Sequence, residues 1–329
     1  MDQLDFKIFK SVGFRPFGRT AGDLSRLNPW VIARKVGADG KTVKSRLSKM
    51  KKSGFIKYFQ IYPNYRLLGV NGSAYLFQLD DVLEKYEIIE KCALVDGVIE
   101  IHNFVGSNIC IDFTYQDGRD ERRRLELLCN LTRCSSPERF YDRVMPQMEG
   151  QSLSNIDWQI IKALRYDAFK PLSKVAKELG LTTKTVRNRF ELMVRNNAII
   201  IVPEVNPAEI TDTITYTLLL YPSPSKKAEV IEKAMETFEN SCFLVESSSS
   251  QGNTMLCLAA RTLAETEDSL IRARKIEGMM NVKLLVLKER TEYTQWIDSA
   301  IDRKIAETSR QEPSSPPTIV WTETTPKRS

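Results

Sequence analysis

The stretch IARKVGADGKTVKSRL (residues 32–47) recurs further along the chain as VAKELGLTTKTVRNRF (residues 175–190), with six of the sixteen positions identical. A shorter match precedes it, between LDFKIFK (residues 4–10) and IDWQIIK (residues 156–162). The first copy holds nine extra residues in FRPFGRTAGDLSRLN (residues 14–28), whose Gly, Pro and Arg content predicts a long loop. A repeat of this length in a chain of 329 residues predicts two copies of one larger unit.

Each copy has the pattern of two helices joined by a short turn. The first helix ends before a glycine, Gly37 or Gly180, which suits the position just after a helix. Asp39 and Thr182 stand where the N-cap of the second helix belongs. Apolar residues on that second helix recur at i, i+4 and i+7: Val43, Leu47 and Met50 in the first copy, Val186, Phe190 and Met193 in the second. One face is therefore core and the other is polar, as in a helix-turn-helix.

Positive charge is concentrated on these two segments. Residues 30–60 hold nine Lys or Arg and one acid, for a net charge of +8. Residues 172–203 hold six Lys or Arg and two acids, for a net charge of +4. The whole chain carries only +6, so the remainder is net negative. Such focusing favours contact with nucleic-acid phosphates over a merely solvated helix face.

A second pattern follows each helix-turn-helix. Short apolar runs come first (residues 54–64 and 198–207), which predict either a β-wing or a strand leading into the next domain. Strand and helix patterns then alternate as β-α-β-β-α-β in both copies. The first copy places them at residues 70–79, 81–95, 97–106, 108–115, 119–131 and 138–146, and the second at 211–221, 226–238, 241–249, 254–261, 262–276 and 281–289. One further helix is expected at residues 292–307.

The composition argues against several other classes of protein. The six cysteines form no C-x-x-C pair, and His102 is the one histidine, so neither a metal site nor another cofactor is expected. No apolar run is long enough to cross a membrane, and the N-terminus lacks the apolar core of a signal peptide. A cytoplasmic protein is therefore expected. No nucleophilic triad or glycine-rich phosphate loop is visible, so the chain is predicted not to be an enzyme.

The second helix-turn-helix resembles that of the Lrp/AsnC transcription regulators, whose pattern runs L-x-x-V-A-x-x-L-G-L-[ST]-x-x-T-V-x-x-R after an Asp in the first helix. The matching residues are Asp157, Leu172, Val175, Ala176, Leu179, Gly180, Leu181, Thr182, Thr185, Val186 and Arg189. The first copy matches through Asp5, Ala33, Gly37, Thr42, Val43 and Arg46. The β-α-β-β-α-β segments are similar to the effector-sensing and oligomerisation domain of that family.

This resemblance implies a transcription regulator that binds double-stranded DNA and associates through its ferredoxin-like domains into homo-oligomers. Family members usually have one such unit and pair as dimers, whereas this chain encodes two, as in a single-chain pseudo-dimer. The residues expected to contact DNA are Lys41, Thr42, Lys44, Ser45, Arg46 and Lys52 in the first copy, and Lys184, Thr185, Arg187, Asn188, Arg189 and Arg195 in the second. A small-molecule effector would lie near the turns at Gly106, Ser107 and Asn108, and at Gly252 and Asn253. Asparagine stands near the place of the family's acidic residue in both turns, which argues against amino-acid sensing.

The expected architecture is α+β, with two winged helix-turn-helix domains alternating with two ferredoxin-like domains. The domain limits are 1–64 and 151–207 for the helix-turn-helix domains, 65–150 and 208–308 for the ferredoxin-like domains, and 309–329 for a tail whose Pro, Ser and Thr content predicts disorder. Two alternatives stay open. Sirohaem decarboxylases resemble the same two-domain unit and are enzymes of a tetrapyrrole, although a single histidine fits that chemistry poorly. A protein-interaction scaffold without DNA binding is the other.

Overall fold

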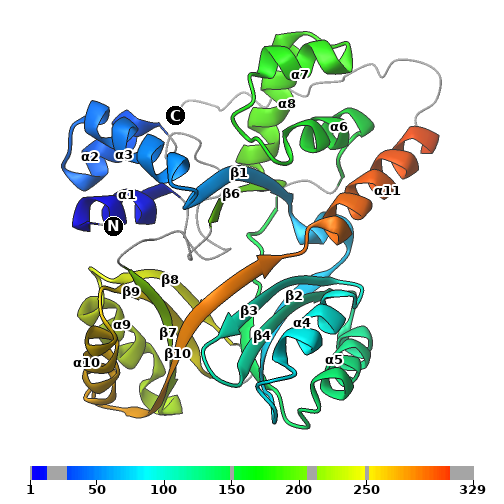
Figure 1. Ribbon diagram of the computed structural model, residues 1–329. Coiled ribbons are helices and arrows are strands. Elements are labelled where there is room, and N and C mark those ends of the chain that lie inside the picture. Colours follow the sequence, from blue (N-terminus) through cyan, green and yellow to red (C-terminus); the bar gives the residue numbers. More distant parts are fainter. Residues whose placement is uncertain (1, 13–27, 149–151, 206–212, 249–251, 312–329) are drawn as a thin grey trace, which may run out of the picture.

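A computed structural model describes residues 2–12, 28–148, 152–205, 213–248 and 252–311. The fold is mixed α+β, with helical units on one side and a large antiparallel sheet on the other (Figure 1). The predicted loop at residues 14–28 lies almost entirely outside the described residues. The predicted tail at 309–329 begins inside the last helix, which continues to Gln311, and the rest of it lies outside the described residues.

Two groups of three helices carry the repeated stretches. The first group holds α1 (Gln3–Val12), α2 (Pro29–Val36) and α3 (Gly40–Lys52), and the second holds α6 (Asn155–Leu164), α7 (Leu172–Leu179) and α8 (Thr183–Arg195). Each group buries the predicted apolar stripe in one shared core, in which Val43 and Val186 are both 0% exposed. The predicted core faces of α3 and α8 are therefore confirmed.

The strands that follow the helices pair with each other. Strand β1 (Ile56–Pro63) runs antiparallel to β6 (Ile199–Val205), with Ile61 opposite Ile201. The expected wing is therefore not a hairpin within one helix-turn-helix. Each copy supplies a single strand, and the two strands satisfy backbone groups of each other. On its other edge β1 bonds to the second helical group, since the Ile61 N–H donates to the Arg165 carbonyl and the Phe59 carbonyl accepts from the Ala168 N–H, both at 2.9 Å. Figure 1 shows this two-stranded ribbon between the two helical groups.

The remaining strands form an eight-stranded sheet in the order β5-β2-β4-β3-β10-β7-β9-β8. Its first half holds β2 (Asn71–Gln78), α4 (Lys85–Ala93), β3 (Val98–Phe104), β4 (Asn108–Tyr115), α5 (Gly118–Thr132) and β5 (Glu138–Asp142). Its second half holds β7 (Ile214–Pro222), α9 (Lys227–Thr237), β8 (Cys242–Ser247), β9 (Thr254–Ala260), α10 (Leu263–Arg274) and β10 (Met279–Glu292). Two short 3₁₀ helices, η2 (Tyr65–Leu68) and η4 (Pro224–Lys226), precede β2 and α9. Helices α4 and α5 flank one half, and α9 and α10 flank the other (Figure 1).

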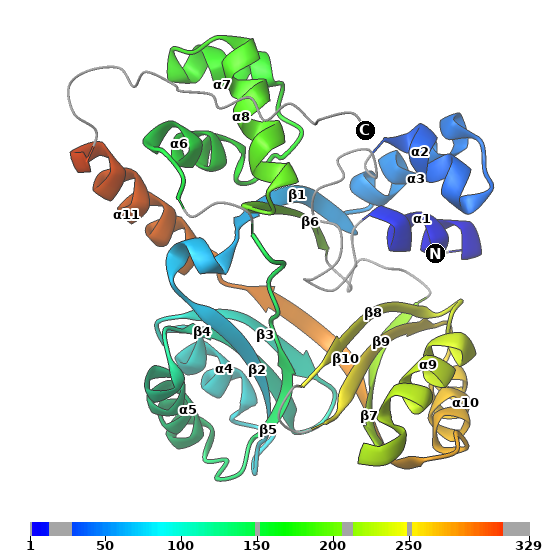
Figure 2. The same cartoon turned by 180° about the vertical axis from the view of Figure 1, so that it is seen from behind.

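Strand β10 joins the two halves. Its first part pairs with β7, with Leu284 opposite Leu218, and its last part pairs with β3, with Arg290 opposite His102. It continues to Glu292, where a helix was expected to begin, because its backbone still pairs with β3 there. The sheet also curls, so that the edge strands β5 and β8 contact each other (Figure 2). Phe140, Leu219 and Met255, from both halves, share the buried layer between them.

The last helix, α11 (Gln295–Gln311), follows β10 and lies against α6. It begins three residues later than the helix expected at 292–307 and ends four residues later, at Gln311. Its buried Ile297 and Ile301 belong to the same core as the helical groups. The C-terminal helix therefore connects the sheet to the second helical group.

Candidate nucleic-acid interface

The turn between α7 and α8 is built from local sequence chemistry. Gly180 ends α7 with a left-handed φ of 67°, which favours glycine because it has no Cβ. The Thr182 side chain then accepts a hydrogen bond from the backbone N–H of Thr185 at 3.1 Å and caps the start of α8. In the other copy, Gly37 has a φ of 68° and Asp39 accepts from the backbone N–H of Lys41 at 2.5 Å. Both turns therefore have the same local geometry, in which a left-handed glycine ends the first helix and a side-chain cap begins the second.

The polar faces of α3 and α8 are exposed. Nine of the twelve predicted DNA contacts lie fully on these faces: Lys41, Thr42, Lys44, Ser45, Lys52, Lys184, Arg187, Asn188 and Arg195. None of their side chains has an ion-pair partner among the described residues. Thr185 is half-buried, and its hydroxyl lies 2.8 Å from that of Thr182, so it shares in the cap of α8. The exposed set is strongly basic and is not neutralised within the structure.

Two of the predicted contacts have a different role. The Arg46 guanidinium pairs with Asp2 and Asp5 of the first helical group, at 3.1 Å to Asp5. In the second group Arg189 pairs with Asp157 at 3.0 Å and also donates to the Ser154 hydroxyl at 3.0 Å. Arg46 thus ties α3 to the first helix of its group, α1, and Arg189 ties α8 to α6. A guanidinium that already pairs with a carboxylate is less free to bind phosphate, and DNA contact by Arg46 and Arg189 stays a prediction.

The acidic partners of these arginines were not predicted as site residues. Asp157 also closes a capping box, because its carboxylate accepts from the Ser154 backbone while the Ser154 side chain accepts from the Asp157 backbone. The signal was present in the sequence, since an Asp and an Arg recur at matching places in both copies. An acidic and a basic residue that recur together at matching positions of both copies indicate an ion pair within each copy.

The two turns expected to bind an effector are occupied by contacts within the chain. The Lys85 ammonium donates to the carbonyl oxygens of Phe104 and Gly106, at 2.5 and 2.6 Å. Burial lowers the pKa of Lys85 to about 8. At the other turn the Asn253 amide donates to the Glu138 carboxylate and to the Arg139 carbonyl, at 3.2 and 3.0 Å. Effector binding at these five turn residues therefore stays a prediction.

Other candidate chemistry is sparse in the described part of the chain. His102 lies 2.6 Å from Glu100, in a buried ionic cluster that also includes Arg290 and Arg143. All six cysteines are free. The described residues contain no group of His, Cys, Asp or Glu arranged to hold a metal ion. None of the described helices has both the length and the apolar character to cross a membrane.

Paired helix-turn-helix units with exposed basic second helices define a class, the helix-turn-helix proteins. Residues 153–193 match the model of the AsnC-type helix-turn-helix domain. A transcriptional regulator of Methanocaldococcus jannaschii, Ptr1, is 30% identical over 132 residues, which cover 40% of this chain and 86% of that protein. An uncharacterised regulator of Pyrococcus horikoshii is 31% identical over 85 residues, or 25% of this chain and 57% of that one. The chain therefore belongs to the Lrp/AsnC family of transcription regulators. It spans little more than half the length of the Pyrococcus relatives that it matches.

The fold extends to a solved structure of a different activity. The sirohaem decarboxylase NirDL, in complex with an iron-uroporphyrin III analogue, aligns with a TM-score of 0.55 at 13% identity, over 94% of this chain and all of that one. At this identity the likeness describes the shared fold alone. It leaves the chemistry to be argued from the residues.

Proposed function

We propose that this chain is a sequence-specific DNA-binding regulator in which one polypeptide supplies two recognition helices, α3 and α8. The two halves, residues 1–150 and 151–308, would act as a pseudo-dimer with a helix-turn-helix and a ferredoxin-like domain each. Association of whole chains through the sheet would add further recognition helices. The proposal extends the family assignment from the second helix-turn-helix to the whole chain.

The pairing of β1 with β6 is the observation that carries this proposal. Seven residue pairs join the strand after α3 to the strand after α8, from Ile56 with Val205 to Pro63 with Ile199. Around this ribbon, the Arg165 guanidinium of the second helical group donates to the Ile61 carbonyl at 3.0 Å. Two recognition helices fixed to one ribbon can engage DNA as a unit, without the entropy cost of pairing two chains.

The proposed contacts are the exposed residues of α3 and α8 without Arg46 and Arg189. Thr42, Ser45 and Thr185 can donate hydroxyl hydrogen bonds to phosphate oxygens, while the lysines supply point charges. Arg187 can present two parallel donors to guanine, and Asn188 can pair in the same way with adenine. Base discrimination would therefore come mainly from α8.

The direct test is fluorescence anisotropy of the full chain on a DNA site selected from a random pool, titrated with salt. Binding through several phosphates predicts a linear fall of log affinity with log salt concentration, with a slope of about −0.9 per phosphate neutralised. Selected sites should be asymmetric, because α3 and α8 present different side chains. The absence of DNA binding at low salt would overturn the proposal and favour a protein-interaction scaffold.

A tetrapyrrole enzyme is the second candidate, because the likeness to the sirohaem decarboxylase covers nearly the whole chain. Such an enzyme would need groups able to bind propionates and to move a proton near the macrocycle. His102 is engaged by Glu100, and the sheet interior around it is filled by ion pairs. An absorbance titration with an iron porphyrin carrying carboxylate side chains, run on the purified chain, decides between the two. A saturable Soret shift with turnover would establish the enzyme.

A further inference from the structure

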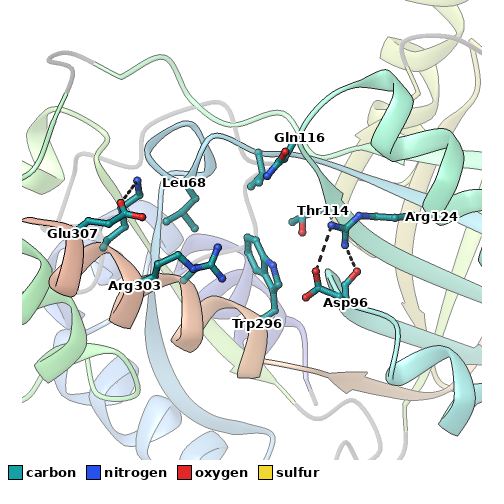
Figure 3. A pocket seen from close by; sticks show the side chains of 11 residues that line it. Leu68, Asp96, Thr114, Gln116, Arg124, Trp296, Arg303 and Glu307 are labelled. Atoms are coloured by element: carbon teal, nitrogen blue, oxygen red, sulfur yellow. Dashed lines mark hydrogen bonds and ion pairs between the residues drawn. The ribbon is translucent and has the colours of Figure 1, made fainter.

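A cavity of about 210 Å³ lies where α11 meets η2 and the first half of the sheet. Its walls include Trp296 and Arg303 from α11, and Thr114, Gln116 and Arg124 from the sheet and α5 (Figure 3). A space of this size suits a small metabolite.

Three basic residues line the cavity, and not all of them are paired with a carboxylate. Arg303 is exposed and has no ion-pair partner among the residues that the structure describes, and its guanidinium reaches toward Trp296 (Figure 3). Lys304 is held by Glu307 at 2.9 Å, so it is neutralised in part. Arg124 is held by the Asp120 carboxylate at 3.0 Å and donates to the Asp96 backbone carbonyl, while the Asp96 carboxylate lies 3.5 Å from its guanidinium. The 81% exposed Asp96 carboxylate is the partner that an incoming anion could displace, because solvent already screens it.

The cavity also offers an aromatic wall. Trp296 is half-buried and packs edge-on against the buried Tyr65 ring at 6.2 Å, which fixes the indole in place. Leu68, Val70 and Ala300 continue this apolar side of the lining. A flat ring can stack against the indole while an anionic group reaches Arg303 on the other side. The two features together select a small aromatic anion over a bare phosphate or a neutral ring.

A comparable recess beside the first helical group has no excess of basic side chains. It lies between α1 and the second half of the sheet, and its charged lining consists of Asp2, Arg261 and Glu265. Acidic groups outnumber the single cation there, and Asp2 is already engaged by Arg46. An anion would be repelled from that recess. A ligand for the first cavity would therefore act on one side of the molecule only.

The position of the cavity gives such a ligand a route to α8. Asp302, next to Arg303 on α11, pairs with Lys162 of α6 at 2.6 Å. The Asn155 amide at the start of α6 donates to the α11 carbonyl of Ile305 at 2.8 Å. Helix α6 in turn holds α8 through the Asp157–Arg189 pair. A ligand that fixes α11 would reduce the freedom of the second helix-turn-helix before DNA binds.

We propose that this cavity binds a small aromatic carboxylate or phosphate, and that its occupancy strengthens DNA binding through α8. This regulatory step rests on the proposed DNA-binding function, whereas binding of the anion itself does not. Linkage requires the coupling to be reciprocal, so bound DNA must tighten anion binding by the same factor.

Calorimetric titration of the full chain with benzoate, phenyl phosphate and neutral benzamide tests the site without DNA. At least one of the two anions is expected to bind about tenfold more tightly than benzamide, since a charge-assisted hydrogen bond is lost with the neutral ring. R303A is expected to lose about tenfold in anion affinity, and R310A, at the end of the same helix, to lose none. Circular dichroism melts check that both variants fold. Absence of anion binding, equal binding of benzamide, or equal behaviour of the two variants would overturn the site.

The regulatory step is tested by anisotropy with labelled DNA at saturating anion. An increase in DNA affinity of about fivefold is expected in the wild type and none in R303A, which also controls for simple competition between anions and DNA phosphates. An anion that binds in the calorimeter but leaves DNA affinity unchanged refutes the regulation. DNA binding measured without anion tests the proposed function separately, so the two failures are distinguishable.

Discussion

The two helix-turn-helix units share one backbone plan but are supported by different residues. In the second unit, Trp158 and Phe190 are almost fully buried, and the Ser154 capping box fixes the start of α6. In the first unit the position of Phe190 is taken by the partly buried Leu47. The start of α1 is capped in the same reciprocal way by a different pair, because the Asp2 carboxylate accepts from the Asp5 N–H at 2.8 Å and the Asp5 carboxylate accepts from the Asp2 N–H at 3.1 Å. The second unit therefore gains more from packing, and the first carries more charge.

This difference parallels the match to the family. The AsnC-type model matches residues 153–193, within the second unit. The first unit keeps the glycine turn, the N-cap and the Asp–Arg pair. Its residues 30–60 carry a net charge of +8, against +4 for residues 172–203 of the second unit. A unit that contributes mainly phosphate contacts needs charge and approximate placement, whereas base contacts need a rigid helix. The comparison therefore indicates a division between affinity and discrimination.

The units are also anchored to the sheet in different ways. In the first, Phe6 and Phe9 of α1 pack against Phe243 of β8, with ring centroids 6.4 and 6.0 Å apart. In the second, polar contacts such as that between Arg165 and Asp298 at 3.1 Å join α6 to α11, in addition to the buried Ile297 and Ile301. Apolar contacts tolerate small shifts, whereas hydrogen bonds have preferred distances and directions. The second unit is therefore the better placed to receive a signal through α11.

The largest expected effect compares the two cores. Phe190→Ala should lower the free energy of unfolding by about 3–5 kcal/mol, because it removes a buried ring and leaves a cavity. Leu47→Ala should cost about 1–2 kcal/mol, at or below the low end of core truncations, because the side chain is half-exposed. Urea denaturation followed by circular dichroism measures both. Equal losses would show that the first unit is as tightly packed as the second.

The next effect compares the recognition helices on DNA. Arg187→Ala should cost about 1–3 kcal/mol on the best site and relax base preference in one half-site. Lys44→Ala should weaken binding to all sequences alike and reduce the salt slope by roughly one. Site selection with each variant, combined with salt titrations, separates the two. The comparison fails if both substitutions affect specific and random DNA equally.

Much of this arrangement could be predicted from the sequence, because local patterns determine it. The apolar stripes at Val43 and Val186 and the two glycine turns depend only on neighbouring residues, and both appear in the structure as expected. The helix-turn-helix units could therefore be placed along the chain without coordinates. Their basic faces could be found from the same helical period.

The remaining features depend on partners distant in sequence. Arg46 and Arg189 look like DNA contacts on a helical wheel, but the wheel does not show that Asp5 and Asp157 fold back beside them. Strands β1 and β6 read as lone apolar runs, since their pairing spans more than a hundred residues. The anion cavity joins Arg124 to Trp296 across a similar distance, and no local motif marks it.

A smaller effect compares the anchors. Phe243→Ala should increase hydrogen exchange mainly in α1 to α3, because it removes the ring on which α1 packs. Asn155→Ala should do so mainly in α6 to α8, at a cost of about 1 kcal/mol, because it removes hydrogen bonds to α11. Exchange measured by mass spectrometry on both variants is the test. If either substitution loosens both units equally, the anchors are not independent.

The smallest effect concerns the joint that both units share, at Glu292 near the end of β10. Gln60 of β1 donates to both carboxylate oxygens of Glu292, at 3.0 and 2.9 Å, and accepts from Arg165 at 2.8 Å. Burial raises the pKa of Glu292 to about 7, despite the hydrogen bonds from Gln60. The joint therefore contains a carboxyl group that titrates near neutral pH, in contact with elements of both helical units.

The sign of the pH effect follows from this raised pKa. The folded chain keeps a proton on Glu292 that the unfolded chain releases near pH 4.5, so stability falls as the pH rises from about 4.5 through about 7. Between pH 6.5 and 7.5 the loss from this group should be about 0.7 kcal/mol. Glu292→Gln should remove that part of the pH dependence of stability, while Glu246, whose pKa burial raises to about 8, contributes equally in the wild type and the variant.

Urea melts of both proteins at the two pH values measure the difference in stability, and hydrogen exchange locates it in the structure. Because Gln60 follows the first unit and Arg165 belongs to the second, both units should lose protection together. A change confined to one of them would mean that the ribbon does not couple the pair.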